Sequence, residues 1–255
     1  AGFSGDFKGY DYIATIDSPL GQMYGYVFDG VYQYSDFYQV ARSDQFILKP
    51  GVTDISEHAG TTVKPGMVKY KDIDGDGVIT TSDRTVIGNG IPKWYGGITN
   101  TFKYREFDLS FMLQFNYGND IYNATRLFAT QSQDERSNQL AEVADRWTPT
   151  HASNKVPSAK GYVKNELYSR FIEDGSFLRL KNVVLGYTIP NKWTKKAYIS
   201  RLRVYASAQN LFCISGYSGY DPEVSTASSN PMTPGLDWGA YPKSRIFTFG
   251  LEVQF

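Results

Sequence analysis

Strict alternation of apolar and polar residues is the clearest signal along the chain. In residues 107–116 every odd position is apolar, and every even position except Met112 is polar. The same alternation runs through residues 247–255. Successive side chains of a β-strand point to opposite faces, so a period of two over about ten residues predicts a strand with one apolar face.

Four further stretches alternate in the same way and are predicted as strands: residues 21–34, 96–104, 176–189 and 202–212. The first of these is rich in aromatic residues, which alternate with smaller or polar ones. The alternation of the third changes phase near Asn182 and Val183. A phase change of this kind indicates a β-bulge, or a point where the strand leaves the bilayer.

The links between these strands are of two kinds. Residues 104–107 allow only a tight hairpin, and residues 190–201 allow a moderate turn. The long links are residues 35–94, 117–175 and 215–244. Short turns at one rim and long loops at the other are typical of an outer-membrane barrel, whose strands need roughly 9–11 tilted residues. We therefore predict an all-β fold, a transmembrane antiparallel β-barrel with long extracellular loops; a soluble β-sandwich is the alternative, although it rarely needs links this long.

One short helix is predicted near residues 137–147, within the long link 117–175. Ser137 is a suitable N-cap, and Pro149 would end the helix. The i, i+3, i+4 and i+7 positions of an amphipathic stripe are filled by Leu140, Val143, Ala144 and Trp147. We expect this stripe to pack on the barrel rim and not to bind a ligand.

Composition narrows the function classes. Lys and Arg number 26, as do Asp and Glu, so the formal charge is zero and a broad basic surface for nucleic acid is not expected. Hydrophobic residues make up 41% and aromatic residues 16% of the chain, which argues against disorder. The chain has one cysteine, so neither an internal disulfide nor a multi-cysteine zinc site can form.

An acidic loop at residues 72–83 carries the most specific chemistry. Oxygen ligands at loop positions 1, 3 and 5, with glycine at position 6, define a calcium loop. Position 12 is an aspartate, shorter than the glutamate of an EF-hand, and no flanking helices are evident, so the loop is free-standing. We predict that it binds Ca²⁺, or Mg²⁺ in the same loop; a solvated turn is the alternative. The predicted ligands are Asp72, Asp74, Asp76, the carbonyl of Val78, Thr80 and Asp83.

Catalytic chemistry is not evident, and we predict no catalytic residues and no enzyme activity. His58 and His151 lie in polar segments and are interpreted as surface histidines, while Cys213 lies among apolar residues and is interpreted as packed. Glu173 and Asp174 precede a glycine and indicate a turn, not an acid/base pair. Aromatic residues on the strands are expected to form girdles at the membrane interfaces. Aromatic residues in the predicted loops either belong to such girdles or stack on a ligand such as a sugar: Tyr217, Tyr220, Trp238 and Tyr241.

A series of short motifs follows along the chain. They are YGYVFDGVYQ (24–33), the acidic loop with DRTVIGN (83–89) and PK (92–93), NYGNDIYN (116–123), RWTP (146–149), FIEDGSFLRLKN (171–182), LGY (185–187), QNLF (209–212) and GYDPE (219–223). In sequence and in order they resemble motifs of the SusC/RagA-type TonB-dependent transporters of the outer membrane.

The resemblance implies that residues 1–255 are a C-terminal portion of a 22-stranded barrel, in which neither a plug domain nor a TonB box is visible. It implies import of large nutrients, oligosaccharides or peptides, with a SusD-type surface lipoprotein as lid and TonB as the source of energy. Phe255 resembles the aromatic signal for barrel assembly. With a periplasmic C-terminus the long links, including the calcium loop, are extracellular. The alternative function is a soluble, calcium-stabilised β-sandwich that binds carbohydrate, and a β-rich glycan lyase or hydrolase is a further rival.

Overall fold

The computed structural model describes residues 3–4, 11–40, 43, 45–131, 138–163, 166–226, 230 and 232–255, with side chains from residue 11 onward. The chain divides into two compact units. The first, here called the loop unit, comprises Ala1–Ile91, Asp120–Glu173 and Val224–Gly239. The second, here called the sheet unit, comprises Pro92–Asn119, Asp174–Glu223 and Ala240–Phe255.

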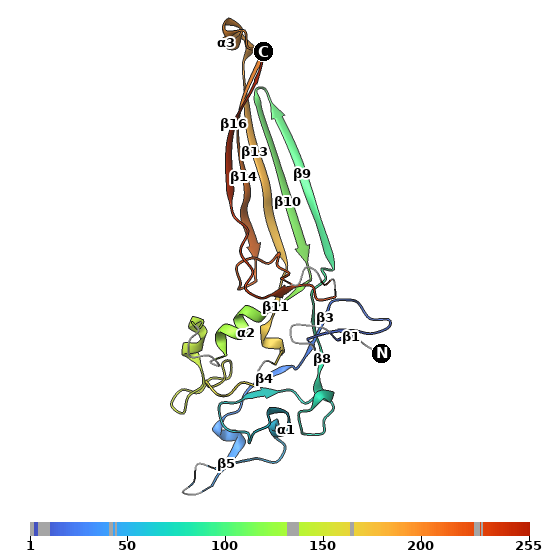
Figure 1. The fold of residues 1–255 in the computed structure, drawn as a ribbon. Helices are drawn as coiled ribbons and strands as arrows, with labels where there is room; N and C mark the ends of the chain where they lie inside the picture. Colours follow the sequence, from blue (N-terminus) through green and yellow to red (C-terminus); the bar gives the residue numbers. More distant parts are fainter. Residues whose placement is uncertain are drawn as a thin grey trace. The chain divides into compact units, whose positions relative to one another are not determined.

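The sheet unit is built on five long strands, each antiparallel to its neighbours (Figure 1). In sheet order they are β16 (Ile246–Gln254), β14 (Arg201–Ser215), β13 (Phe177–Ile189), β10 (Phe107–Tyr117) and β9 (Trp94–Tyr104). These five strands were predicted from the alternation, with ends that differ by up to three residues. The sheet is open, with β16 and β9 as its edges.

One face of this sheet carries a continuous set of apolar residues to which all five strands contribute. The register places Leu109 opposite Leu185, Leu185 opposite Ala206, and Ala206 opposite Phe249. Phe249 is 81% exposed, and among the described residues no second sheet covers this row. The β-sandwich alternative is therefore wrong, because the inner faces of a sandwich bury their apolar residues against each other.

The predicted bulge and the predicted tight hairpin are both present. The β13–β14 register shifts between Leu180 and Asn182, so Lys181 is the extra residue, one position before the predicted site. The Lys181 ammonium donates to Gln114 Oε1 at 2.6 Å. Tyr104 pairs with Phe107, which leaves a two-residue turn in which Arg105 has a φ of 53°. The turn between β13 and β14 holds helix α3 (Asn191–Thr194) and the 3₁₀ helix η5 (Lys195–Ala197).

The loop unit contains short strands in several small sheets. The sheets are β1 (Phe3–Ser4), β2 (Tyr12–Ala14), β3 (Gln22–Gly25) and β8 (Thr85–Asn89); β4 (Phe28–Val31) and β7 (Val68–Tyr70); β5 (Phe37–Gln39) and β6 (Phe46–Leu48); and β12 (Ile172–Asp174), β11 (Asp120–Asn123) and β15 (Leu236–Asp237). The helices are η1 (Tyr34–Asp36), α1 (Ser56–Ala59), η2 (Thr81–Asp83), α2 (Ala124–Thr130), η3 (Ala141–Asp145) and η4 (Ser169–Phe171).

The single long strand predicted for residues 21–34 is wrong. This stretch forms β3 and β4, which pair with β8 and β7 and not with any strand of the five-stranded sheet. Among the aromatic residues of the alternation Tyr34 is 47% exposed, but Tyr26 and Tyr32 are at most 1% exposed in the core of the loop unit. Their period of two reflects packing against protein.

That core is largely made of aromatic rings. The ring of Tyr70 stacks on Tyr26 with centroids 5.0 Å apart and lies 5.4 Å from Tyr168, which contacts Phe171 edge-on at 4.9 Å. Complete burial raises the pKa of Tyr70 and of Tyr168 well above the usual value of a phenol, so both hydroxyls stay neutral. The loop unit therefore has a hydrophobic core of its own.

The predicted helix near residues 137–147 is shorter and of a different type. The five residues of η3 form a 3₁₀ helix, and Ser137, the predicted N-cap, lies outside the described residues. Val143 and Trp147 are buried as the stripe requires, but Leu140 and Ala144 are exposed. The chain turns away after η3, because Trp147 N–H donates to the carbonyl of Val156 at 2.9 Å instead of continuing the helix.

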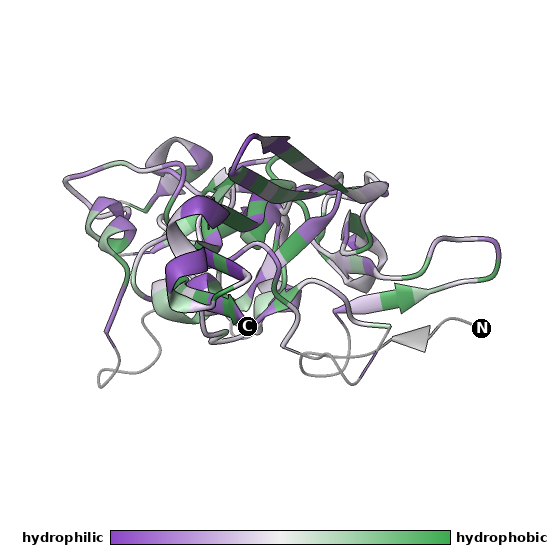
Figure 2. Ribbon diagram, turned by 90° about the horizontal axis from the view of Figure 1, so that it is seen from above, coloured by the Kyte–Doolittle hydropathy of each residue, from purple (hydrophilic) through white to green (hydrophobic). Residues whose placement is uncertain are grey.

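Among the described residues, no helix is both long and apolar enough to span a membrane. Figure 2 shows hydrophobic and hydrophilic residues interleaved along the ribbon. The longest helix of the described residues is α2, with 7 residues.

Candidate functional site

The acidic loop follows β7 and ends in η2. The carboxylates of Asp72, Asp74 and Asp76 each offer an oxygen, and these oxygens lie within 4.8 Å of one another. Asp72 accepts hydrogen bonds from the N–H groups of Gly75 at 2.6 Å and Gly77 at 2.8 Å. Both glycines have positive φ, 81° and 88°, which a side chain would disfavour. The glycines thus let the loop curl tightly enough to bring the carboxylates together.

A buried residue at the end of the acidic loop stabilises its conformation. Asp83 is fully buried, and its two oxygens accept from the N–H groups of Ile73 and Thr80, both at 2.8 Å. The Thr80 hydroxyl in turn accepts from the N–H of Ser82. Each carboxylate oxygen of Asp83 accepts a hydrogen bond from the backbone, so Asp83 stabilises the conformation of the loop. Only the remaining lone pairs of these oxygens are open to an ion.

The centre of the loop is anchored to the segment before α1. Val78 forms a parallel bridge with Asp54, whose N–H donates to the carbonyl of Gly77. The next residue, Ile79, is completely buried and donates its N–H to the carbonyl of Asp54 at 2.8 Å. All six predicted ligand residues therefore lie in one loop with a buried support, and three of their carboxylates converge.

Electrostatics differ within the cluster. The hydrogen bonds from Gly77 and Gly75 lower the pKa of Asp72. For Asp74 the hydrogen bond from Asp76 N–H lowers the pKa, but desolvation and the charges of Asp76, Asp83 and Asp72 together raise it above the usual value. The cluster therefore concentrates repulsive negative charge that a bound cation would relieve.

The four loop aromatics proposed to meet a ligand have different surroundings. In the sheet unit Tyr217 is buried, whereas Tyr220 is 80% and Tyr241 90% exposed. In the loop unit Trp238 is partly exposed and packs edge-on against Phe128, with ring centroids 5.5 Å apart. Tyr220 and Tyr241 thus have open ring faces, and Tyr217 does not.

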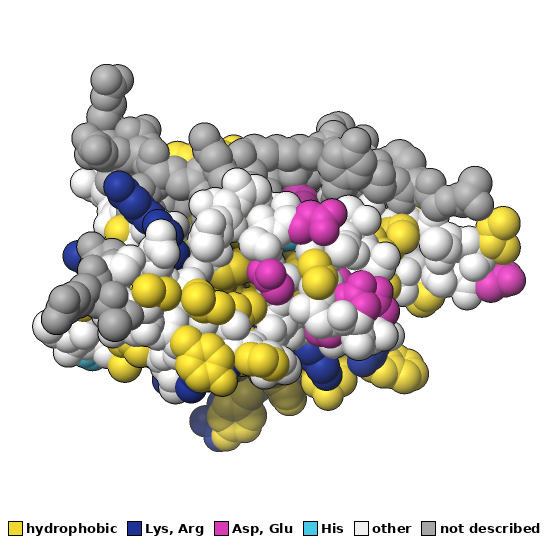
Figure 3. Space-filling view, turned by 90° about the horizontal axis from the view of Figure 1, so that it is seen from below, with side chains coloured by type: hydrophobic (Ala, Val, Ile, Leu, Met, Phe, Trp, Pro, Cys, Tyr) yellow, Lys and Arg dark blue, Asp and Glu magenta, His cyan; other side chains and the backbone are white. Residues whose placement is uncertain are grey.

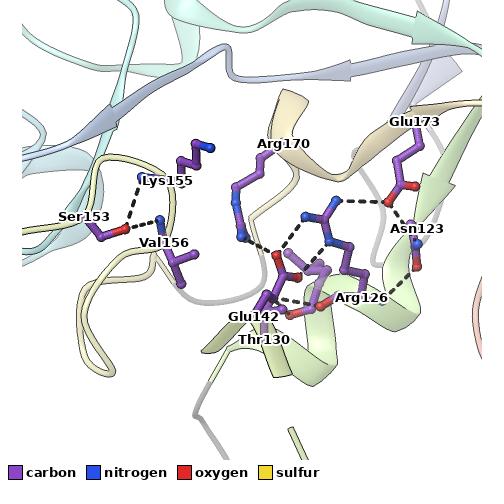
Figure 4. Close-up of polar contacts among 10 residues, drawn as sticks. Asn123, Arg126, Thr130, Glu142, Ser153, Lys155, Val156, Arg170 and Glu173 are labelled. Atoms are coloured by element: carbon purple, nitrogen blue, oxygen red, sulfur yellow. Dashed lines mark hydrogen bonds and ion pairs between the residues drawn. The ribbon is translucent and has the colours of Figure 1, made fainter. Parts of the chain in front are cut away.

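A charged cluster in the loop unit was not predicted from the sequence (Figure 4). Arg126 on α2 forms two hydrogen bonds of 2.8 Å to Glu142 on η3 and one of 3.1 Å to Glu173. Arg170 on η4 donates to Glu142 at 2.8 Å. Hydrogen bonding to Glu142 raises the pKa of Arg126 further. The cluster binds together three segments that lie far apart in sequence, which is why no local motif announced it.

Comparison with known proteins gives the family. No family model matches the chain. The chain is 33% identical over 240 residues to TonB-dependent receptor P3 of Formosa agariphila, covering 92% of this chain and 22% of the relative. It is 31% identical over 193 residues to TonB-dependent receptor SusC of Bacteroides thetaiotaomicron, covering 75% of this chain and 18% of the relative. The chain thus spans about a fifth of these relatives.

Solved structures share the fold. The chain aligns with the RagAB peptide importer in its "open-open" state with a TM-score of 0.68 and 20% identity, over 99% of this chain and 25% of that chain. The chain belongs to the SusC/RagA-type TonB-dependent transporters. The predicted resemblance is confirmed, and the five-stranded sheet is part of the transmembrane barrel of this family.

In a transporter barrel one face of each strand contacts lipid and the other faces the interior. The exposed apolar row of the sheet unit is the lipid face. On the opposite face Arg179, with a side chain only 4% exposed, donates to Asp221 at 2.5 Å, and Lys243 pairs with Glu223. Since Asp221 and Glu223 belong to the GYDPE motif, that transporter motif ties the link after β14 to the inner side of β13.

Three residues of the transporter lie differently from the sequence interpretation. His58 is not a surface residue, because its side chain is 15% exposed and contacts Tyr26 at 3.4 Å and Glu166 at 3.2 Å. Cys213 is exposed and not packed, and it pairs in register with Arg179 on the face opposite the apolar row. Glu173 is part of the Arg126 cluster as well as of a strand end. His151 is exposed as predicted and lies 2.9 Å from Asp145.

Charge is mixed on the face of the molecule drawn in Figure 3. Figure 3 shows acidic and basic side chains on the same face, with hydrophobic side chains between them. This distribution agrees with the formal charge of zero.

Proposed function

We propose that the chain is part of an importer that carries large nutrients, oligosaccharides or peptides, across the outer membrane. In this proposal the whole transporter works with a SusD-type surface lipoprotein and draws energy from TonB. The observation that supports it best is the five-stranded antiparallel sheet with one exposed apolar face, in a chain that aligns over 92% of its length with a TonB-dependent receptor. That relative is named a receptor and not an enzyme.

Uptake by whole cells tests the proposal. Cells that express the intact transporter are given labelled oligosaccharides and labelled peptides, with and without a functional TonB. We expect accumulation of one cargo class that disappears without TonB, and co-purification of a SusD-type lipoprotein with the transporter. Accumulation that does not depend on TonB would refute the proposed energy source, and capture without uptake would favour a binding role.

We further propose that the C-terminus is periplasmic and that Phe255 serves as the assembly signal. Ser200, in the turn between β13 and β14, donates to the carbonyl of Gln254 near the end of β16. The short turn and the chain end therefore share one rim of the sheet, as in barrels with short periplasmic turns. In a transporter whose exposed Cys213 is replaced by serine, a cysteine introduced at Ser200 should react with an impermeant reagent only after the outer membrane is opened; labelling of intact cells would reverse the orientation.

For the acidic loop we propose a Ca²⁺ site, with Mg²⁺ as a weaker occupant. The fit rests on three convergent carboxylates, the tight glycine turns and the buried support described above. Asp72, Asp74 and Asp76 would hold the ion, with the carbonyl of Val78 and the hydroxyl of Thr80 completing the set, and Asp83 shaping the loop. The ion would neutralise the crowded carboxylates and so order the loop.

Metal content and stability together test this site. Replacing Asp74 and Asp76 by alanine should abolish bound calcium and remove the stabilisation that calcium gives the loop unit, about 2.7 kcal/mol at a hundredfold excess over Kd. The control is Asp29→Ala with Asp17→Ala, which removes equal charge elsewhere in the loop unit. Equal calcium content in both variants would eliminate the site.

For the exposed aromatics we propose a contact with cargo. Tyr220 and Tyr241 offer open ring faces, on which a sugar ring or an aromatic peptide side chain could stack. Their alanine variants should raise the cargo concentration needed for half-maximal uptake, while Tyr217→Ala should instead reduce the amount of folded transporter. Unchanged uptake in both exposed variants would remove this role. Trp238, partly covered by Phe128, is proposed as a weaker contact.

A further inference from the structure

The turn between β13 and β14, residues 190–200 and here called the basic turn, has an unusual charge. It contains Lys192, Lys195 and Lys196 and no acidic residue, and all three lysines are exposed. The described residues form no ion pair with any of them, whereas the nearby Arg201 and Arg203 both pair with Glu252 at 3.7 Å. Three positive charges are therefore presented outward without a partner in the sheet unit.

Aromatic side chains project from the same turn. Trp193 is 64% and Tyr198 90% exposed, and the Lys192 ammonium lies 5.7 Å from the centroid of the Trp193 ring. Exposing two large amphipathic rings to water is unfavourable, but such rings are common where a protein surface meets both hydrocarbon and head groups.

Hydrogen bonds connect the basic turn to itself and to the end of β16. Thr194 is buried, Ile199 N–H donates to the carbonyl of Thr194, and Ser200 is bonded to Gln254. Tyr198 has a φ of 58°, a conformation that costs a bulky residue energy and persists only where its surroundings impose it. The lysines and aromatics are thus carried on an ordered platform.

The position of the turn in the sheet identifies its surroundings. Ile189, Leu202 and Val253 pair with one another across β13, β14 and β16 and continue the apolar row to the end where the turn begins. Figure 1 shows α3 at that end of the strands, beside the C-terminus. Because the apolar row contacts hydrocarbon, residues just beyond its end lie at the level of the lipid head groups.

We propose that the basic turn binds the head groups of anionic phospholipids. The three unpaired lysines supply charge complementarity, and Trp193 and Tyr198 supply the interfacial anchor. Each basic residue near an anionic membrane surface contributes roughly fivefold in affinity, so three together give on the order of a hundredfold. This role concerns lipid attachment and is independent of which cargo the transporter carries.

Fluorescence quenching by brominated lipids tests the proposal. The intact transporter is placed in phosphatidylcholine nanodiscs that contain a small, equal fraction of either brominated phosphatidylglycerol or brominated phosphatidylcholine. The fluorescence of Trp193 is obtained as the difference between the spectra of the wild type and of the Trp193→Phe variant. We expect stronger quenching by the anionic lipid, and we expect Lys192→Gln, Lys195→Gln and Lys196→Gln together to abolish that preference.

The matched control removes the same charge from the loop unit by Lys64→Gln, Lys71→Gln and Lys160→Gln, three exposed lysines, and should leave the preference intact. Equal quenching by both lipids in the wild type would overturn the proposal, because it would mean contact without recognition of charge. No quenching by either lipid would also overturn it and would point to a protein covering the turn. A preference lost equally in both triple variants would show only a general effect of net charge.

Discussion

Aromatic residues are abundant in both units, yet they have opposite surroundings. In the loop unit Tyr26, Tyr70 and Tyr168 are almost completely buried, and the ring of Tyr70 packs on both of the others. In the sheet unit Trp94 and Phe249 stand exposed on the strands. The same side chains thus form a protein core in one unit and a lipid-facing surface in the other. Alternation along a strand shows that one face is apolar, and it does not show whether that face meets protein or hydrocarbon.

The two units should therefore respond differently to loss of an apolar side chain. The loop unit carries its own core, so its stability depends on internal packing. The apolar face of the sheet unit gains its favourable surroundings from lipid. Substitutions of similar chemistry in the two units test this difference.

The largest effect is expected from Phe171→Ala, because truncation of a buried phenylalanine costs about 3–5 kcal/mol. The variant should increase hydrogen exchange of amides in the loop unit of the intact transporter. Phe249→Ala is the control, since its ring is exposed on the lipid face and its loss leaves no internal cavity. Equal hydrogen exchange in both variants would contradict the separate core.

A charge on the lipid face should have the next largest effect. Phe111→Arg places a cation on the apolar row of β10, at a cost of about 2–4 kcal/mol near the bilayer midplane. Ser110→Arg adds the same side chain one position earlier, on the opposite face, and should cost little. The measurement is the folded fraction in urea titrations in lipid vesicles. If the two variants titrate alike, the assignment of the two faces fails.

Disruption of the charged cluster should have an intermediate effect confined to the loop unit. Glu142→Gln removes the charge of the carboxylate that accepts hydrogen bonds from Arg126 and Arg170. A hydrogen bond to a charged group contributes about 1.5–3 kcal/mol. Glu57→Gln is the control, because Glu57 is exposed. Protection of loop-unit amides from hydrogen exchange should fall only in the first variant.

The same residue predicts a pH dependence. Desolvation raises the pKa of Glu142, but the hydrogen bond from Arg126 and the charge of Arg170 outweigh it, and the net pKa is lowered. Because the pKa of Glu142 is lowered in the folded state, its ionisation stabilises the fold fully above the usual glutamate pKa of about 4.3. This stabilisation is lost as pH falls through the pKa of the folded state. Wild type should lose loop-unit stability in that acid range, and Glu142→Gln should lose less. A parallel acid loss in both proteins would assign the effect to other carboxylates.

The sequence predicted the sheet unit better than the loop unit for a physical reason. The five barrel strands repeat one simple environment, with lipid on one side and a polar interior on the other, and a period of two records it directly. Residues 21–34 carry the same period but turn inward, and the short strands of the long links depend on contacts between distant segments. Such tertiary contacts leave no local period.

The candidate functional residues, like the fold, were predicted from the sequence only in part. The acidic loop is local, so spacing alone identified the residues whose carboxylates converge. The Arg126–Glu142–Glu173 cluster spans segments 16 and 47 positions apart, and no spacing rule reaches across them. His58 was predicted to lie on the surface because its sequence neighbours are polar, but its ring packs against Tyr26 of the aromatic core.

The smallest effect concerns the two-residue turn between β9 and β10. Arg105 has a φ of 53°, where glycine is free and a residue with a Cβ pays roughly 1–2 kcal/mol. Arg105→Gly and Arg105→Ala both lose the contact between the guanidinium and the Tyr104 ring, so their difference isolates the backbone. The glycine variant should be the more stable of the two by about 1 kcal/mol in urea titrations in lipid vesicles. Arg105 lies in the sheet unit, so hydrogen exchange of amides in the loop unit should not change in either variant. A change in the loop unit would show that the two units do not respond separately.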